Sequence, residues 1–321
     1  MDITISVQQK LPFDTLLDVG YSSSLARNLF WNRETDAVPL GRRFDPAYKD
    51  PTTGSALSTA FLTPIRGYTS IPIAEAAGSS NYHSLQVSVN RRFATRLQFG
   101  VSWTWSKAMD FTDDDTSLIP SPLSPRSWDY GMATFDRTHV LKANVIWDLP
   151  GTSSRNPVVK AVLNDWHLSA IPSFVSGAPL GITWSSTAGV DITGTPSQTA
   201  RIVVTGNPVM PKSERTFYTN FRTDVFQLPA VGTFGNAART LIRGPGINNW
   251  DTGLFKMFRV REFARLQFRW EMYNALNHTQ FSTLDTGARF DANGNQVNAS
   301  FGQFTASRSP RVMQFSLRFT F

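Results

Sequence analysis

Residues 313–321 read MQFSLRFTF, and this stretch at the end of the chain decides the fold. Met313, Phe315, Leu317, Phe319 and Phe321 are apolar, and every residue between them is polar. Successive side chains of a β-strand point to opposite faces, so a period of two places all the apolar residues on one face. The stretch therefore predicts a strand that separates an apolar environment from a polar one.

The same alternation recurs upstream in eight further segments, which makes nine predicted strands. Ile146 breaks the pattern, and the phase slips at Leu254 and Phe255, which we interpret as a β-bulge. Several segments are 9 to 13 residues long. Strands of soluble proteins average about 5 to 6 residues, whereas about 9 to 11 are needed to cross a bilayer at a tilt. Length therefore favours a membrane protein. The clear segments are residues 84–90, 97–106, 141–149 and 265–272, and the weaker ones are residues 3–7, 17–21, 166–174 and 250–260.

The composition of the chain excludes several classes of protein and of functional site. The chain has 321 residues, no cysteine and a formal net charge of +7. The missing cysteine excludes disulfide frameworks, thiolate metal sites and thiol nucleophiles. The basic residues are scattered and no nucleic-acid-binding motif accompanies them, so we expect no nucleic-acid partner. No apolar run reaches the length of about 18 residues of a spanning helix, and residues 1–10 lack the pattern of a signal peptide. A membrane role would therefore be that of a β-barrel.

Shorter and longer connections alternate along the chain, as in outer-membrane barrels with short periplasmic turns and long extracellular loops. If the tight turns are periplasmic, the first strand starts at the outer surface, so we expect Met1 to mark a truncation or an internal start. A soluble or surface-attached β-sandwich that binds glycan or protein through its loops stays as the alternative, because its strands alternate too. The tight connections are residues 11–13, 94–96 and 261–263, the intermediate one is 150–165, and the long ones are 23–81, 107–137, 177–249 and 277–310.

The barrel interpretation assigns a role to each face. Polar faces would form the lumen wall, and tryptophans would collect in aromatic girdles at the two membrane interfaces. The long loops would either make the first contact with a ligand or only shield the mouth of the barrel. The predicted wall comprises Lys142, Asn144, Arg265, Gln267, Arg269, Glu271, Gln314 and Arg318, and the predicted girdles comprise Trp103, Trp105, Trp147 and Trp166.

Motifs of enzymes are missing. The sequence contains no G-x-S-x-G elbow, H-E-x-x-H pair, P-loop or dinucleotide-binding glycine pattern. The four histidines are dispersed, and Asp113 to Asp115 are more typical of a solvated loop than of a cation site. We therefore expect neither an enzyme nor a resident metal or cofactor.

Short motifs in a characteristic order span nearly the whole chain. They include Asn81 to Gln86, Thr104 to Lys107, Phe135 to His139, Ser176 to Pro179, Arg243 to Gly246, Phe268 to Glu271, Asn274 to His278 and Ser309 to Arg311. Together they resemble the C-terminal barrel of TonB-dependent receptors, in particular the Oar-like group with a carboxypeptidase-regulatory-like N-terminal domain.

This resemblance implies energised uptake of a large or scarce solute through a plugged barrel of about 22 strands. Residues 1–321 would be one part of that barrel, with the regulatory domain, the plug, the first strands and the contact with the TonB complex supplied by missing N-terminal sequence. Partners would be outer-membrane lipid, the barrel assembly machinery and a solute that is a carbohydrate, a peptide or a metal chelate. Phe315, Leu317, Phe319 and Phe321 look like the C-terminal signal for barrel assembly.

Overall fold

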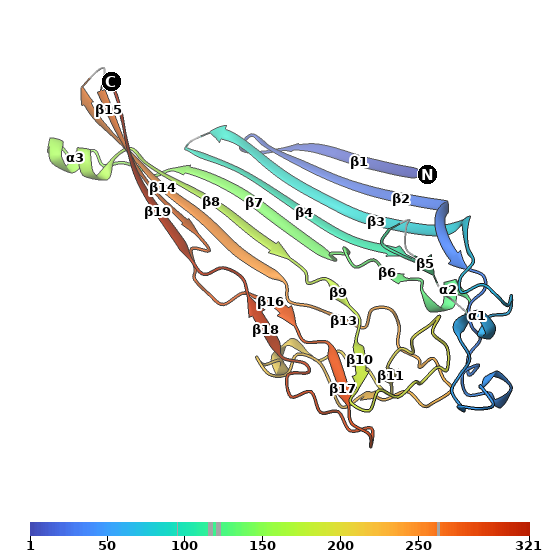
Figure 1. Ribbon diagram of the computed structural model, residues 1–321. Helices are drawn as coiled ribbons and strands as arrows, with labels where there is room; N and C mark the ends of the chain where they lie inside the picture. Colours follow the sequence, from blue (N-terminus) through green and yellow to red (C-terminus); the bar gives the residue numbers. More distant parts are fainter. Residues whose placement is uncertain (95, 115–117, 120–122, 262–263) are drawn as a thin grey trace.

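The computed structural model describes residues 1–94, 96–114, 118–119, 123–261 and 264–321. Within these residues, nine long strands form one curved antiparallel sheet and lie beside each other in chain order (Figure 1). All nine predicted strands are confirmed, and β1 and β19 are the two edges of the sheet. The long strands are β1 (Asp2–Leu11), β2 (Thr15–Glu34), β3 (Pro72–Ala94), β4 (Leu97–Asp110), β7 (His139–Asp148), β8 (Trp166–Val175), β14 (Ile247–Arg261), β15 (Ala264–Tyr273) and β19 (Val312–Thr320).

The strand register gathers the alternating residues into one apolar and one polar face. On the last two strands, Phe268 pairs with Leu317 and Trp270 pairs with Phe315. Paired residues of antiparallel strands project to the same face, so their side chains form continuous apolar rows. Phe315 is 62% exposed and Leu317 is 68% exposed. The apolar face thus lies open in the described part of the chain, and no second sheet packs against it as a sandwich would require.

Two strands are much longer than predicted. β2 has 20 residues and β3 has 23, and they pair from Thr15↔Arg91 to Glu34↔Pro72. The prediction that residues 23–81 form a connection is therefore wrong at both ends, and the loop spans only residues 35–71. Backbone hydrogen bonds continue a ladder whatever the side chains are, so the hairpin extends past the end of the alternating pattern. Asn28, with φ of +55°, marks the irregular register there.

The bulge predicted at Leu254 and Phe255 is also wrong. β14 keeps an unbroken register with β15 from Thr252 to Arg259, and its irregularity lies at the turn, between Arg259 and Arg261. The phase slip in the sequence instead places Lys256 on the apolar face and Phe255 on the polar face. Phe255 is accommodated there by the Arg269 guanidinium, 5.0 Å from its ring centroid.

The connections divide between the two ends of the sheet as predicted. The strand ends that flank the predicted tight turns lie at one end, with the C-terminus, and the long connections lie at the other (Figure 1). Residues 95, 262 and 263 of those turns lie outside the described residues. The intermediate connection carries helix α3 (Pro157–Leu163) at the tight-turn end. Among the described residues, no helix combines the length and hydropathy required to span a bilayer.

The long connections contain a compact substructure. We call residues 176–246 and 277–311 the cap. Its core includes Ile202, Phe221 and Phe290, which are almost fully buried. The loops are therefore packed against each other. Whether they contact a ligand or only shield the mouth of the barrel stays a prediction. Four short strand pairs organise the cap: β9 (Pro179–Leu180) with β13 (Ile242–Arg243), β10 (Thr183–Ser186) with β17 (Gly287–Phe290), β11 (Val203–Val204) with β12 (Phe226–Gln227), and β16 (Phe281–Leu284) with β18 (Phe304–Ser307).

The remaining elements are short. Strands β5 and β6 pair with the ends of β2 and β4. They extend the large sheet only at its loop end, where the shorter helical segments also lie (Figure 1). These elements are β5 (Leu118–Ile119), β6 (Gly131–Met132), α1 (Thr59–Leu62), α2 (Pro125–Trp128) and the 3-10 segments Pro46–Tyr48 and Lys212–Glu214.

Candidate functional site

All eight predicted wall residues share the polar face, but only some of them lie close together. Gln267 pairs with Arg318 and Glu271 with Gln314 across β15 and β19. Arg269 lies 3.5 Å from Glu271 in an ion pair along β15. The other two residues, Lys142 and Asn144 on β7, are separated from this group by β8 and β14. The polar face is thus a broad wall and not a single cluster.

A groove of about 710 Å³ lies where this wall meets the cap. Of the predicted wall residues, only Lys142 lines it. The sheet supplies one side of the groove and the cap, from Gln280 onward, supplies the other. The groove is lined by Lys142, Ser173, Val175, Ile247, Asn249, Asp251, Tyr273, Asn274, Gln280, Ser282, Ser307, Arg308, Ser309, Pro310 and Val312.

A hydrogen-bond network fixes the cap side of the groove to the sheet. Oδ1 of Asp251 accepts from Nδ2 of Asn249 at 2.9 Å and from the backbone N–H of Asn274 at 3.0 Å. Nε2 of Gln280 donates to Oδ1 of Asn249 at 3.2 Å and to Oδ1 of Asn274 at 3.3 Å. Asn274 and Gln280 are both buried. A buried and mutually satisfied amide network of this kind holds a fixed geometry.

The turn after β15 depends on two asparagines. Asn274 and Asn277 have φ values of +51° and +50°, in the left-handed region that asparagine tolerates better than most residues. Oδ1 of Asn277 also accepts from the backbone N–H of Arg311 at 3.1 Å, at the other end of the connection. Sequence reasoning missed this role, although two asparagines spaced by three residues directly after a strand were a readable turn signal.

The chemistry of the groove is polar with a small positive excess. Lys142 and Arg308 carry positive charges and Asp251 a negative one, beside serine hydroxyls, amides and the Tyr273 phenol. Such a surface can donate and accept hydrogen bonds with a polyhydroxylated, peptidic or anionic solute. Among the described residues, no three acidic or histidine side chains gather as a metal-binding group.

Ion pairs tie the cap to the rest of the sheet. Asp136, whose side chain is 1% exposed, receives Arg243 at 2.6 Å. Arg239 lies 2.6 Å from Asp110 and 2.8 Å from Asp113, so Asp113 is engaged in an ion pair. These contacts join the connection after β8 to the region after β4, which are far apart in sequence.

A fourth pair, between Arg201 and Asp129 at 3.1 Å, has shifted pKa values at both partners. Burial raises the pKa of Asp129, although the nearby Arg201 guanidinium partly opposes that rise. Burial likewise lowers the pKa of Arg201. The guanidinium also lies 4.2 Å from the Trp128 ring centroid and donates to the Trp128 carbonyl oxygen at 2.5 Å. This arginine therefore locks α2 against the cap through three kinds of contact.

Three motifs quoted from the sequence meet in space. Arg243 donates to the carbonyl oxygens of Gly177 and Asp136, each at 3.3 Å. A Cβ atom on Gly177 would lie 1.8 Å from the carbonyl oxygen of Gly244, so only glycine fits at this close approach. The motifs around Asp136, Gly177 and Gly244 therefore describe one joint between the sheet and the cap.

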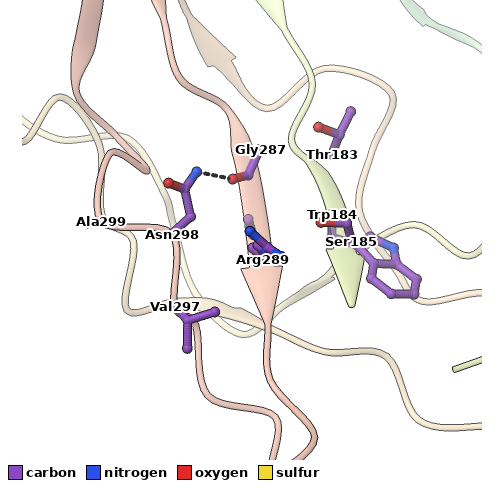
Figure 2. A pocket seen from close by; sticks show the side chains of 9 residues that line it. Thr183, Trp184, Ser185, Gly287, Arg289, Val297, Asn298 and Ala299 are labelled. Carbon is purple, nitrogen blue, oxygen red and sulfur yellow. Dashed lines mark hydrogen bonds between the residues drawn. The ribbon is translucent and has the colours of Figure 1, made fainter. Parts of the chain in front are cut away.

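A second hollow, of about 370 Å³, lies on the cap beside β10 and β17. Figure 2 shows Asn298 reaching the backbone of β17, where its Nδ2 donates to the Gly287 carbonyl oxygen at 2.7 Å. Burial alone would raise the pKa of nearby Asp285, but hydrogen bonds from Ser300, from the backbone N–H of Gly287 and from Asn298 lower it. This carboxylate thus holds the hollow's edge in place as an anion.

With this geometry established, comparison with known proteins decides the class. The family described as outer membrane beta barrel domain has a sequence model that matches residues 1–314. The chain belongs to this family. The fold class is therefore confirmed as an antiparallel transmembrane β-barrel with long extracellular loops in the outer membrane, and the β-sandwich alternative is wrong.

Among solved structures, the outer membrane transporter YddB from Escherichia coli is similar to this chain, with a TM-score of 0.48 and 9% sequence identity. The similarity covers 99% of this chain and 32% of that one, so the chain spans about a third of its neighbour's length. No curated protein matches the chain.

In an outer membrane barrel domain, the apolar face contacts lipid and the polar face lines the interior. Trp105 pairs with His139 at the loop end of β7, whereas Trp147 pairs with Leu97 at the tight turn. Eight residues of β4 separate these two levels. That spacing is about 27 Å along the strand. For strands tilted by about 40° it corresponds to about 20 Å along the barrel axis, close to the height of an apolar band. Trp103 lies near the first level and Trp166 near the second, so their role as girdles stays a prediction with suitable spacing.

The four residues of the predicted assembly signal lie on and just after edge strand β19. Phe315, Leu317, Phe319 and Phe321 are all exposed. They form the outermost apolar row of the lipid-facing side, next to the unpaired edge of the sheet. Their recognition by the assembly machinery stays a prediction.

Proposed function

We propose that this chain forms the C-terminal part of the barrel of a TonB-dependent receptor of the Oar-like group, which takes up a large or scarce polar solute. The observation that carries the proposal is the polar groove between the barrel wall and the packed cap. A solute held first by the cap would meet hydroxyls, amides and Lys142 as it enters the lumen.

In this proposal the chain provides the wall and the ligand-facing surface and performs no catalysis. The full barrel has about 22 strands. The plug and the segment that contacts the TonB complex come from sequence outside residues 1–321. Lipid surrounds the apolar face, and the assembly machinery reads the end of β19. The solute is a carbohydrate, a peptide or a metal chelate.

The test follows solute depletion by cells. Cells with and without the gene receive a defined mixture of oligosaccharides, peptides and ferric chelates, each with and without a protonophore. We expect faster depletion of one solute class in cells with the gene, and loss of that difference when the protonophore removes the energy supply. Depletion that is independent of the gene, or that survives the protonophore, contradicts energised uptake.

A matched pair of variants localises the effect to the groove. Lys142→Glu reverses an exposed charge that lines the groove, whereas Lys49→Glu makes the same change at an exposed position in the loop of residues 35–71. We expect the first variant to slow the depletion and the second to leave it unchanged. Equal depletion rates in the two variants would show that the solute does not pass through the groove.

A further inference from the structure

Helix α3 presents an uncovered apolar surface at the periplasmic end of the barrel. Its sequence is PVVKAVL, and none of its residues is buried. Val158 is 67% exposed, Val162 is 53% exposed and Leu163 is 52% exposed. In water, so much exposed apolar surface on a short helix is unfavourable. The surface therefore needs an apolar environment.

The helix is well formed despite its length. Asn156 caps it, because its Oδ1 accepts from the backbone N–H groups of Val158 and Val159, and Pro157 occupies the first turn. Asn164 closes the segment by accepting from the backbone N–H of Thr152 at 2.6 Å and donating to its carbonyl oxygen at 3.3 Å. The segment thus has a defined position relative to the strand ends.

Two side chains of the lipid-facing side hold the end of α3. Nε1 of Trp166 donates to the Val162 carbonyl oxygen at 2.8 Å. Lys256, which pairs with Trp166 across β8 and β14, donates through Nζ to the Asn164 carbonyl oxygen. Both residues belong to the apolar face. The segment therefore leaves the barrel on its outer side, and Figure 1 shows α3 beyond the strand ends, away from the cap.

The charges of the segment suit a phospholipid surface. Residues 150–165 carry Arg155 and Lys160 as cations and Asp165 as the single carboxylate. Arg155 and Lys160 are both exposed. Trp166 lies at the foot of the segment, and tryptophan prefers the level of the lipid headgroups. Trp166, which binds the end of α3, also belongs to the lipid-facing rows of the barrel.

We propose that α3 lies in the periplasmic leaflet of the outer membrane and contacts phospholipid at the boundary between headgroups and acyl chains. Val158, Val162 and Leu163 enter the acyl region, while Lys160 and Arg155 remain among the phosphates. Lys256 and Trp166 clamp the helix to the barrel at this depth. The connection between β7 and β8 thus anchors the barrel wall in the periplasmic leaflet of the outer membrane.

Site-directed spin labelling tests this directly, because the chain has no cysteine of its own. The full-length protein is reconstituted into vesicles of phosphatidylethanolamine and phosphatidylglycerol, with a nitroxide at Val162→Cys. Ser153→Cys, an exposed polar position in the same connection, is the matched aqueous control, and Leu317→Cys is the lipid-facing control. The measurement is the ratio of accessibility to oxygen over accessibility to a water-soluble nickel chelate. Each variant must migrate as a folded barrel on an unheated gel.

We expect the ratio at Val162 to exceed the ratio at Ser153 several-fold and to approach that at Leu317. A ratio at Val162 equal to that at Ser153 places α3 in water and overturns the proposal. Protection of Val162 from both reagents also overturns it, since a protein partner then covers the helix. A water-exposed Leu317 would contradict the lipid-facing assignment of the sheet itself, and so separates that failure from a failure at α3 alone.

Discussion

Arginine at Phe268 should destabilise the barrel much more than arginine at its neighbour Gln267. Phe268 is the fifth of the ten residues of β15 and faces lipid, whereas Gln267 faces the lumen. A cation on the lipid face costs about 2 to 4 kcal/mol near the midplane of the bilayer, and little on the lumen side. That range corresponds to a factor of about 30 to 900 in the unfolding equilibrium constant.

The structure adds a contribution to this cost that the sequence did not reveal. Lys256 lies directly across from Phe268 on β14, on the same face, and its side chain is buried. Phe268→Arg would therefore oppose two like charges in a cross-strand pair, which is destabilising. It would also remove the edge contact of the Phe268 ring with Trp166, whose centroids are 6.5 Å apart. We expect the observed loss to lie toward the upper end of the range.

The assay is guanidinium unfolding of the protein in vesicles, followed by tryptophan fluorescence, with heat-dependent gel migration as an independent measure of folding. Gln267→Arg introduces the same side chain one residue away and is the matched control. It would also face a cation across the strands, Arg318 on β19, so the difference between the two losses reports the environments of the two faces and not the like charges. Equal losses at the two positions, or a larger loss at Gln267, would refute the assignment of the two faces.

Three further predictions concern the cap. Asp136→Ala leaves Arg243 without its carboxylate and should destabilise the joint by about 3 to 5 kcal/mol, seen as faster limited proteolysis of residues 176–246 in the folded barrel. Gly177→Ala should have a similar effect, because its Cβ atom would lie 1.8 Å from the Gly244 carbonyl oxygen; unchanged amide hydrogen exchange around β9 and β13 would contradict this. Because the folded-state pKa of Asp285 is lowered, its ionised form stabilises the cap above its ordinary pKa of about 3.9, and this contribution is lost as the pH falls through the lower folded value. Proteolysis of wild type with an acid-active protease should therefore accelerate at low pH, and the acceleration should be smaller in Asp285→Asn.

The membrane strands were predictable because one face of each strand contacts lipid and the other contacts water, so apolar and polar residues must alternate along it. Nine alternating segments identified nine strands, and the order of short and long connections identified the two ends of the sheet. Lys256 was the exception, because its amine is satisfied by the Asn164 carbonyl oxygen and lies 5.2 Å from the Trp166 ring centroid. The residues around Lys256 do not indicate that a distant carbonyl oxygen accepts a hydrogen bond from its amine, so the sequence suggested a bulge where the register is regular.

The cap and most of the groove were not predictable in this way. Strands of two to four residues are too short to show a period, and the buried residues Ile202 and Phe290 come from different connections. Of the groove, only Lys142 belonged to the predicted wall. The contact of Asn274 with Asp251, and that of Gln280 with Asn274, depend on a turn with a left-handed asparagine. Contacts between distant segments leave no periodic trace in the sequence.

The cap core has a consequence for the order of folding. Its members come from the connection between β8 and β14 and from that between β15 and β19, and the parallel pair β10 and β17 joins the two. Each connection supplies only part of this core, and bringing the two together costs chain entropy until the intervening strands fix their ends. The cap should therefore mature last, after its four supporting strands have inserted. A cell would then display a folded ligand-facing surface only on barrels whose C-terminal strands have already been inserted.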